Sequence, residues 1–243
     1  IRRQGGRSDS TRGGMTGFDL VTGRVRDADG VEGLGYNYTA GTSAAAIKTL
    51  VEEGFKPLLE GEPADRIERH WQRMWWSLHY GGRGGLAIFA ISAVDIALWD
   101  LKARRAEAPL WCLLGGHDPK VHAYAGGIDL QFTLDDLLDQ TRRHLANGFR
   151  AIKMKVGREK LGEDVARVAA MRELLGPDTP LMVDANMGWS PDQAIRAARA
   201  FAPHDLYWLE EPTIPDDYDG YRRIAREGGL PTAAGEDLRT LAE

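Results

Sequence analysis

The chain of 243 residues contains a single cysteine, Cys112, so it cannot form an internal disulfide bond. A single cysteine is typical of a protein from a reducing compartment, and we expect a cytoplasmic location. Because Cys112 stands in the apolar stretch LWCLLGG, its surroundings favour a packing role over a nucleophilic one.

Long apolar runs and an excess of positive charge are also missing. No stretch reaches the ~18 consecutive apolar residues of a membrane-spanning helix, so we expect no membrane partner. The net charge of −5 provides no basic field for nucleic acid. The polar start, IRRQGGRSDSTRGG, lacks the apolar segment of a secretory signal and an initiator methionine. We expect residues 1–14 to be flexible and the chain to begin inside a longer reading frame.

The first half of the chain predicts an α+β domain. FDLVTGRVR and VEGLGYNYT, joined by the turn sequence DADG, predict a β-hairpin over residues 18–38. Apolar residues then recur at helical spacing over residues 43–59 and 63–78. A glycine-rich loop, YGGRGGLA, precedes a long apolar helix with the sequence IFAISAVDIALWDLKARR. Strands followed by helices indicate the α+β class.

From residue 121 the pattern changes to alternating strands and helices. The predicted strands are VHAYAGGI, AIKMKV, LMVDAN, LYWLEEP and PTAAGED, with a helical segment between each pair. Thr133 with Asp136 and Ser190 before Pro191 are predicted helix starts. Such alternation predicts a parallel sheet covered by helices, and a barrel of such units places its active site at the carboxyl ends of the strands.

Three acidic residues recur at one place in successive units. Asp184, Glu210 and Glu236 are separated by 26 residues each and stand near the carboxyl ends of their strands. Carboxylates that converge on one centre repel one another and need a hard divalent cation, for which Mg²⁺ is the natural choice. Asn186 shares a strand face with Asp184 and is a candidate to contact the substrate. The alternative is that these acids lie at the surface where loops begin.

The strand AIKMKVG, residues 151–157, places Lys153 and Lys155 on one face. In a barrel this face looks toward the same rim as Asp184. A neighbouring positive charge and partial burial disfavour a second ammonium ion, so we expect Lys155 to serve as a base near neutral pH. The alternative is that both lysines form ion pairs with acids across the barrel. A base beside a metal is typical of α-proton abstraction from a carboxylate, which gives an enediolate.

Taken together, the motifs resemble those of the mandelate racemase branch of the enolase superfamily. They are KMK at 153–155, VDAN at 183–186, WLEEP at 208–212 and AGED at 234–237. SAVDIALWDLKAR followed by APLWCLLGG is similar to the family's link between its capping domain and its barrel. The resemblance implies an α+β capping domain over residues 1–120 and the first five units of a (β/α)₈ TIM-type barrel over residues 121–243.

The resemblance also implies the roles of the site residues. Mg²⁺ would be bound by Asp184, Glu210 and Glu236, with Lys155 as the base on one face of the substrate and Lys153 adjusting its basicity. Family members select substrates with capping-domain loops, which makes Tyr36, Tyr38 and Arg83 candidate specificity residues. A small-molecule carboxylate is the expected substrate, and the family favours a homo-oligomer at full length.

The chain departs from the family pattern in its length. A (β/α)₈ barrel takes ~250 residues, but 123 residues follow position 120. The six histidines do not stand where the family's later His–Asp pair would lie. We therefore expect a C-terminally truncated chain whose acid or base for the opposite substrate face lies beyond residue 243.

Three functions follow from these observations. The leading hypothesis is a Mg²⁺-dependent lyase that dehydrates a sugar acid, an aldonate or aldarate, to a 2-keto-3-deoxy acid through an enediolate. A racemase or epimerase of a 2-hydroxy acid at the same site is the alternative, and it needs a second base. A hypothesis of another class is that the truncated chain is not catalytic by itself.

Overall fold

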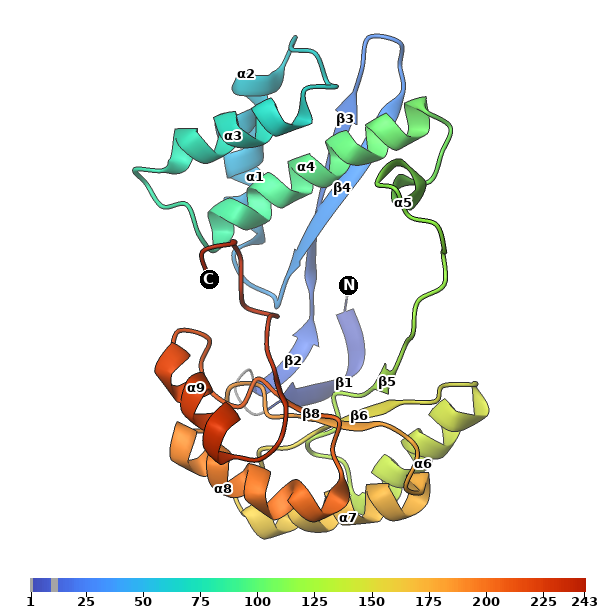
Figure 1. Ribbon diagram of the computed structural model, residues 1–243. Helices are drawn as coiled ribbons and strands as arrows, with labels where there is room; N and C mark the ends of the chain where they lie inside the picture. The colour runs from blue at the N-terminus through green and yellow to red at the C-terminus, as the bar shows by residue number, and fades with distance from the viewer. Residues whose placement is uncertain (1, 10–12) are drawn as a thin grey trace. The chain divides into compact units, whose positions relative to one another are not determined.

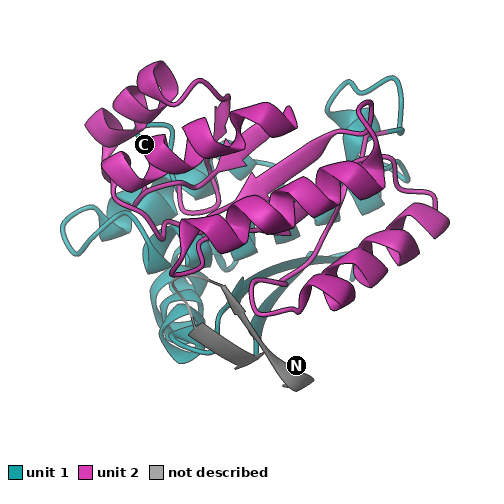
Figure 2. Ribbon diagram, turned by 90° about the horizontal axis from the view of Figure 1, so that it is seen from below, with its two compact units in different colours: residues 1–4, 16–120, 239–243 teal, residues 5–15, 121–238 magenta. Residues whose placement is uncertain are grey.

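The computed structural model describes residues 2–9 and 13–243, with side chains from residue 17 onward. Contacts divide the chain into two compact units (Figure 2). The first is formed by residues 16–120 with residues 239–243, and the second by residues 121–238; each also takes in part of the N-terminal segment. Within the described residues, no helix is both long and apolar enough to span a membrane.

Two short strands occupy much of the N-terminal segment. Strands β1 (Arg2–Asp9) and β2 (Gly13–Gly17) form a two-stranded sheet. Sequence analysis predicted flexibility over residues 1–14; residues 1 and 10–12 of that segment lie outside the described residues.

The predicted hairpin is confirmed in the first unit. Strands β3 (Asp19–Arg26) and β4 (Glu32–Thr39) pair antiparallel, with Gly23 opposite Gly35. The long helix α4 (Leu86–Arg105) packs directly on β4. A Cβ atom at Gly35 would lie 1.9 Å from the Ala93 carbonyl oxygen, so this close approach requires glycine.

Helices complete the core of the first unit. They are α1 (Ala44–Thr49), the π-helical turn η1 (Leu50–Phe55), α2 (Lys56–Leu59), α3 (Ile67–Leu78) and α5 (Leu110–Leu113). Their central contacts with α4 involve the fully buried side chains of Ile47, Phe55 and Met74. None of the four residues of α5 is buried, and Cys112 is exposed, so the packing role expected for Cys112 is wrong.

The second unit is a parallel sheet whose strands follow one another in sequence order. They are β5 (Ala125–Gly126), β6 (Ile152–Lys155), β7 (Leu181–Asp184), β8 (Trp208–Glu210) and β9 (Thr232–Ala233). The segments between strands contain α6 (Leu134–Ala146), α7 (Leu161–Leu175), α8 (Pro191–Phe201), η2 (Ala202–His204) and α9 (Tyr218–Glu227). The predicted alternation and barrel-type fold are confirmed, although the strands are shorter than the apolar patterns suggested.

One face of this sheet packs on the helices. Figure 1 shows α6, α7 and α8 along one side of the sheet. The buried core joins Ile152 and Met154 of β6 to Val168 of α7 and Phe201 of α8. Because side chains alternate along a strand, the residues between these apolar ones, beginning with Lys153, point to the opposite face.

Both predicted helix starts are present. Thr133 accepts a hydrogen bond from the backbone N–H of Asp136 at the start of α6. Ser190 and Gln193 form a reciprocal capping box at the start of α8. These caps satisfy N–H groups that the first turn of a helix leaves unpaired, and they fix where each strand-to-helix loop ends.

Candidate active site at the carboxyl ends of the strands

Three candidate site residues lie in one row across the sheet. Lys155, the last residue of β6, is in register with Asp184 of β7, which is in register with Glu210 of β8. One pleat deeper, Lys153 is in register with Met182 and then Trp208. The row lies on the sheet face opposite the helices and at the strand ends where barrel enzymes place their active sites.

The two lysines are joined to the acids by ion pairs. The Lys155 ammonium lies 2.6 Å from an oxygen of Asp184. Lys153 lies 3.2 Å from the same oxygen and forms a second ion pair with Glu210. These acids lie on the neighbouring strands β7 and β8, so the pairs are not the ones across the barrel that the alternative named, and the role of each lysine stays a prediction.

Electrostatics favour the charged forms of Lys153 and Asp184. Burial alone would lower the pKa of Lys153, but the charge of Asp184 and the hydrogen bond and charge of Glu210 outweigh it and raise the pKa above its ordinary value. Burial would raise the pKa of Asp184, and the charges of Lys155 and Lys153 reverse this and hold the pKa below its usual range. Lys153 is thus a lasting positive charge beside Lys155 at neutral pH.

Aromatic side chains support the deeper part of the row. The indole N–H of Trp208 donates a 3.0 Å hydrogen bond to Glu210. The ring of Tyr124 meets Trp208 edge-on at 5.8 Å between centroids, and the Lys153 ammonium lies 5.4 Å from the Tyr124 ring centre. Sequence analysis missed these three contacts. The position of Trp208, two residues before Glu210 on a strand, is the signal that could have revealed its contact.

Glu211 holds the segment that carries the third acid. Its carboxylate is buried and accepts hydrogen bonds from the backbone N–H groups of Gly235 at 2.6 Å and Glu236 at 3.1 Å. Its other oxygen accepts one from the hydroxyl of Tyr221 at 2.8 Å. These contacts give Glu211 a structural role, because they hold the backbone of the segment that carries Glu236.

Glu236 lies three residues beyond the end of β9 and is exposed. It lines a cavity of about 260 Å³ together with Glu210 and Trp208. Among the residues that the structure describes, no three acidic, histidine or cysteine side chains are gathered closely enough to hold a metal ion. The structure therefore brings Asp184 and Glu210 into one row and places Glu236 on a cavity wall shared with Glu210.

The chemistry of these donors fits Mg²⁺. All three candidate ligands are carboxylates, the hard oxygen donors that Mg²⁺ takes in small number. Two of these carboxylates, Asp184 and Glu210, already form ion pairs with the ammonium groups of Lys153 and Lys155. The strand ends therefore bring enough negative charge together to attract cations.

The backbone turns sharply just after the acids. Asn186, Met187 and Glu211 have positive φ angles of 43°, 64° and 41°, a conformation that costs energy for residues other than glycine. Sequence analysis assumed that strand alternation puts Asn186 on the same face as Asp184. β7 ends at Asp184, so this rule does not apply to Asn186. Asn186 is buried, and its backbone N–H donates to Asp184 at 2.9 Å.

The three candidate specificity residues belong to the first unit. Tyr36 and Tyr38 project from β4 with 54% and 59% of their surface exposed. Arg83 precedes α4, and its guanidinium lies 5.7 Å from the centre of the Trp75 ring. Their contribution to substrate choice stays a prediction.

Comparison with known proteins agrees with this arrangement. Residues 9–115 match the mandelate racemase / muconate lactonizing enzyme N-terminal domain, and residues 136–243 match the enolase C-terminal domain-like family. The chain is 60% identical to the 3,6-anhydro-alpha-L-galactonate cycloisomerase of Streptomyces coelicolor, over 96% of this chain and 65% of that protein. It is 38% identical to the L-talarate/galactarate dehydratase of Salmonella typhimurium, over 94% of this chain and 58% of that protein.

A solved structure shows the same fold. The crystal structure of a racemase from Streptomyces coelicolor with bound magnesium matches with a TM-score of 0.96 and 59% identity, covering 98% of this chain and 67% of that one. An α+β unit followed by parallel strand–helix units with acids and lysines at the strand ends is the architecture of the enolase superfamily. Within it, the chain belongs to the mandelate racemase / muconate lactonizing enzyme family, as the motifs indicated. It spans 58% to 65% of the length of these curated relatives.

Proposed function

We propose that the protein abstracts the α-proton of a sugar-acid carboxylate and eliminates an oxygen from the β-carbon. The observation that carries this proposal is the row of Lys155, Asp184 and Glu210 across three neighbouring strands. This row sets an amine beside carboxylates at the rim where barrel enzymes act. A carboxylate substrate with a hydroxyl at C2 matches these groups.

Each side chain has a defined task in the proposed reaction. Lys155 takes the proton from C2, and the electron pair of that C–H bond passes toward the carboxylate to give an enediolate. Lys153 keeps its own proton because Asp184 and Glu210 raise its pKa. Its positive charge lies beside Lys155, since both amines contact the same oxygen of Asp184.

Asp184, Glu210 and Glu236 would hold Mg²⁺. When bound, the ion supplies a fixed positive charge that stabilises the extra negative charge developing on the substrate carboxylate.

The leaving group distinguishes the finer alternatives. In a 3,6-anhydro sugar acid the oxygen on C3 belongs to a ring ether, so cleavage of the C3–O bond opens the ring and loses no water. In an aldonate or aldarate the same cleavage releases water. In both routes the departing oxygen takes up a proton, and the resulting enol gains a proton at C3 and loses its hydroxyl proton to become a 2-keto-3-deoxy acid. The relative at 60% identity favours the ring ether, and the relative at 38% identity favours dehydration.

The test incubates the full gene product with Mg²⁺ in D₂O, separately with 3,6-anhydro-α-L-galactonate, galactarate and L-talarate. We expect the anhydro acid to give a keto acid of unchanged elemental composition with deuterium at C3. A product lighter by one water from galactarate or L-talarate would instead assign a dehydratase. Deuterium at C2 with inversion and no keto acid would assign a racemase and refute the elimination.

A pair of variants tests the base. Lys155→Ala should abolish proton removal from C2 while Mg²⁺ affinity, measured by calorimetry, changes little, because lysine is not among the proposed ligands. Lys160→Ala is the matched control, since Lys160 is an exposed lysine on the loop that follows β6. Equal exchange in the two variants would show that Lys155 is not the base.

A further inference from the structure

A buried group of charges lies around the end of β6. It consists of Asp129, from the loop after β5, and of Asp164 and Arg167, from the first turns of α7. The exposed fractions of these residues are 0%, 0% and 4%. Burying charges is costly unless they are paired and hydrogen-bonded, so such a cluster calls for an explanation beyond packing.

Two of these residues bind the backbone of Lys155. The carboxylate of Asp129 accepts a 2.9 Å hydrogen bond from the Lys155 N–H. The guanidinium of Arg167 donates a 2.9 Å hydrogen bond to the Lys155 carbonyl oxygen. Both polar groups of this peptide segment are therefore held by side chains rather than by a strand.

The length of β5 explains why side chains are needed there. Residues of β6 alternate between partners, and Ile152 and Val156 bond toward β7 whereas Ala151 bonds toward β5. Lys155 therefore presents its N–H and C=O to the side of β5. That strand ends at Gly126, opposite Lys153, so it does not reach Lys155. Asp129 and Arg167 take the place of the absent strand residues.

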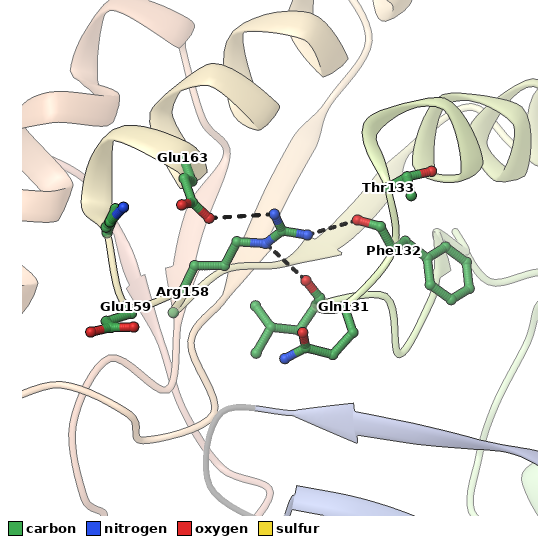
Figure 3. Close-up of a pocket in the computed structure, with 9 residues that line it drawn as sticks. Gln131, Phe132, Thr133, Arg158, Glu159 and Glu163 are labelled. Carbon is green, nitrogen blue, oxygen red and sulfur yellow. Dashed lines mark hydrogen bonds and ion pairs between the residues drawn. The ribbon is translucent and has the colours of Figure 1, made fainter.

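The loop that carries Asp129 is itself fastened. Arg167 donates to the Asp129 carbonyl oxygen at 2.9 Å, and Gln140 donates to the Asp129 carboxylate at 2.8 Å. Figure 3 shows Arg158, whose guanidinium donates to the carbonyl oxygens of Leu130 at 3.0 Å and Phe132 at 2.7 Å.

The loop that follows Lys155 is held by the third buried charge. One oxygen of Asp164 accepts hydrogen bonds from the N–H groups of Gly157 and Arg158, both at 2.8 Å. Its other oxygen lies 3.3 Å from the guanidinium of Arg167. The loops after β5 and β6 are thus tied together on both sides of Lys155.

We propose that Asp129 and Arg167 are positioning residues that fix the backbone of Lys155 and so set the place of its amine for proton transfer. The inference rests on the proposed function of Lys155 as a base. Misplacing a catalytic group by about 1 Å can cost ~10²-fold in rate. Without these contacts neither polar backbone group of Lys155 is held, and the bond from Val156 to β7 anchors only the next residue.

The experiment compares Asp129→Ala with Asp129→Asn in the full gene product. Alanine removes the acceptor for the Lys155 N–H, and we expect kcat for proton removal from C2 to fall ~10²-fold with KM nearly unchanged. Asparagine keeps an acceptor oxygen, so it should restore most of the lost kcat. Equal kcat values for the two variants would overturn the proposal.

Arg172 provides the matched control for Arg167. It lies on the same helix and also binds backbone carbonyls, those of Gly176, Thr179, His204 and Asp205, at 2.7 to 2.9 Å. We expect Arg167→Ala and Arg172→Ala both to lower the melting temperature, and Arg167→Ala alone to lower kcat. A similar loss of kcat in both would show a structural role and overturn the proposal.

Amide hydrogen exchange separates this proposal from the proposed function. Exchange of the Lys155 N–H should be faster in Asp129→Ala than in Asp129→Asn, whatever the substrate. If the wild-type protein removes no proton from any of the three acids, the proposed function fails while the exchange result still decides whether Asp129 holds this backbone. If exchange at Lys155 is the same in both variants, the positioning role is refuted.

Discussion

Removal of the Glu211 side chain is a sharp test of how the third acidic segment is held. In Glu211→Ala, the partly buried backbone N–H groups of Gly235 and Glu236 lose their carboxylate acceptor. The hydroxyl of Tyr221 can turn to the carbonyl oxygen of Thr213, 3.0 Å away, so this group is not left unpaired.

The magnitude follows from these contacts. Each hydrogen bond to a charged acceptor contributes about 1.5–3 kcal/mol, and two such bonds are lost. Glu211→Ala should therefore lower the free energy of unfolding by about 3–5 kcal/mol. Glu211→Gln keeps one acceptor oxygen for both N–H groups and places its amide near Tyr221, so we expect a loss of about 1 kcal/mol.

The assay is thermal and urea unfolding of the two variants beside wild type and Glu173→Ala. Glu173 is an exposed glutamate on α7, and its removal should change the free energy of unfolding by less than about 0.5 kcal/mol. A loss of 3–5 kcal/mol corresponds to a fall in melting temperature of roughly 6–20 °C for a chain of this size. Equal stabilities of Glu211→Ala and Glu211→Gln would contradict the role assigned to the two N–H groups.

Two further predictions concern the first unit and the pH dependence. Gly35→Ala should lower the free energy of unfolding by at least about 2–3 kcal/mol, because its Cβ would lie 1.9 Å from the Ala93 carbonyl oxygen. Gly162→Ala is the control: a Cβ there meets open space, so this variant should be neutral or stabilising. The melting temperatures of both variants test this prediction. Burial, with a smaller contribution from Glu68, raises the pKa of Asp95, so its ionised form opposes folding above the ordinary aspartate pKa. Asp95→Asn should therefore raise the melting temperature at pH 7 but not near or below about pH 4, where both states of the wild type hold the proton. An advantage independent of pH would rule out this cause.

Much of the second unit could be predicted because its sequence pattern and its packing agree. Ile152 and Met154 alternate with Lys153 and Lys155, and the structure packs the first pair on the helices. Thr133 and Ser190 fixed two helix starts through local hydrogen bonds.

Other features depended on partners that are distant in sequence. Strand β5 pairs only over Ala125–Gly126, since pairing rather than apolar character sets where a strand ends. Sequence analysis used strand alternation to place Asn186 beside Asp184. The positive φ of Asn186 shows that this residue is not in a strand, so alternation does not apply to it. Asp129 sits in GGIDLQF, where nothing local distinguishes it from a loop acid, and Lys155 lies 26 residues away. The roles predicted for the acids and lysines await the experiments on metal binding and proton exchange.

The register of β6, β7 and β8 has a consequence for how this sequence can change. Lys155, Asp184 and Glu210 stand side by side because each strand alternates in phase with its neighbour. One residue inserted in β7 before Val183 would turn the Asp184 carboxylate toward the helices and Val183 toward the charged row. Short insertions should be tolerated in the exposed turns between helices and strands, whereas these strands should accept substitutions but not changes of length.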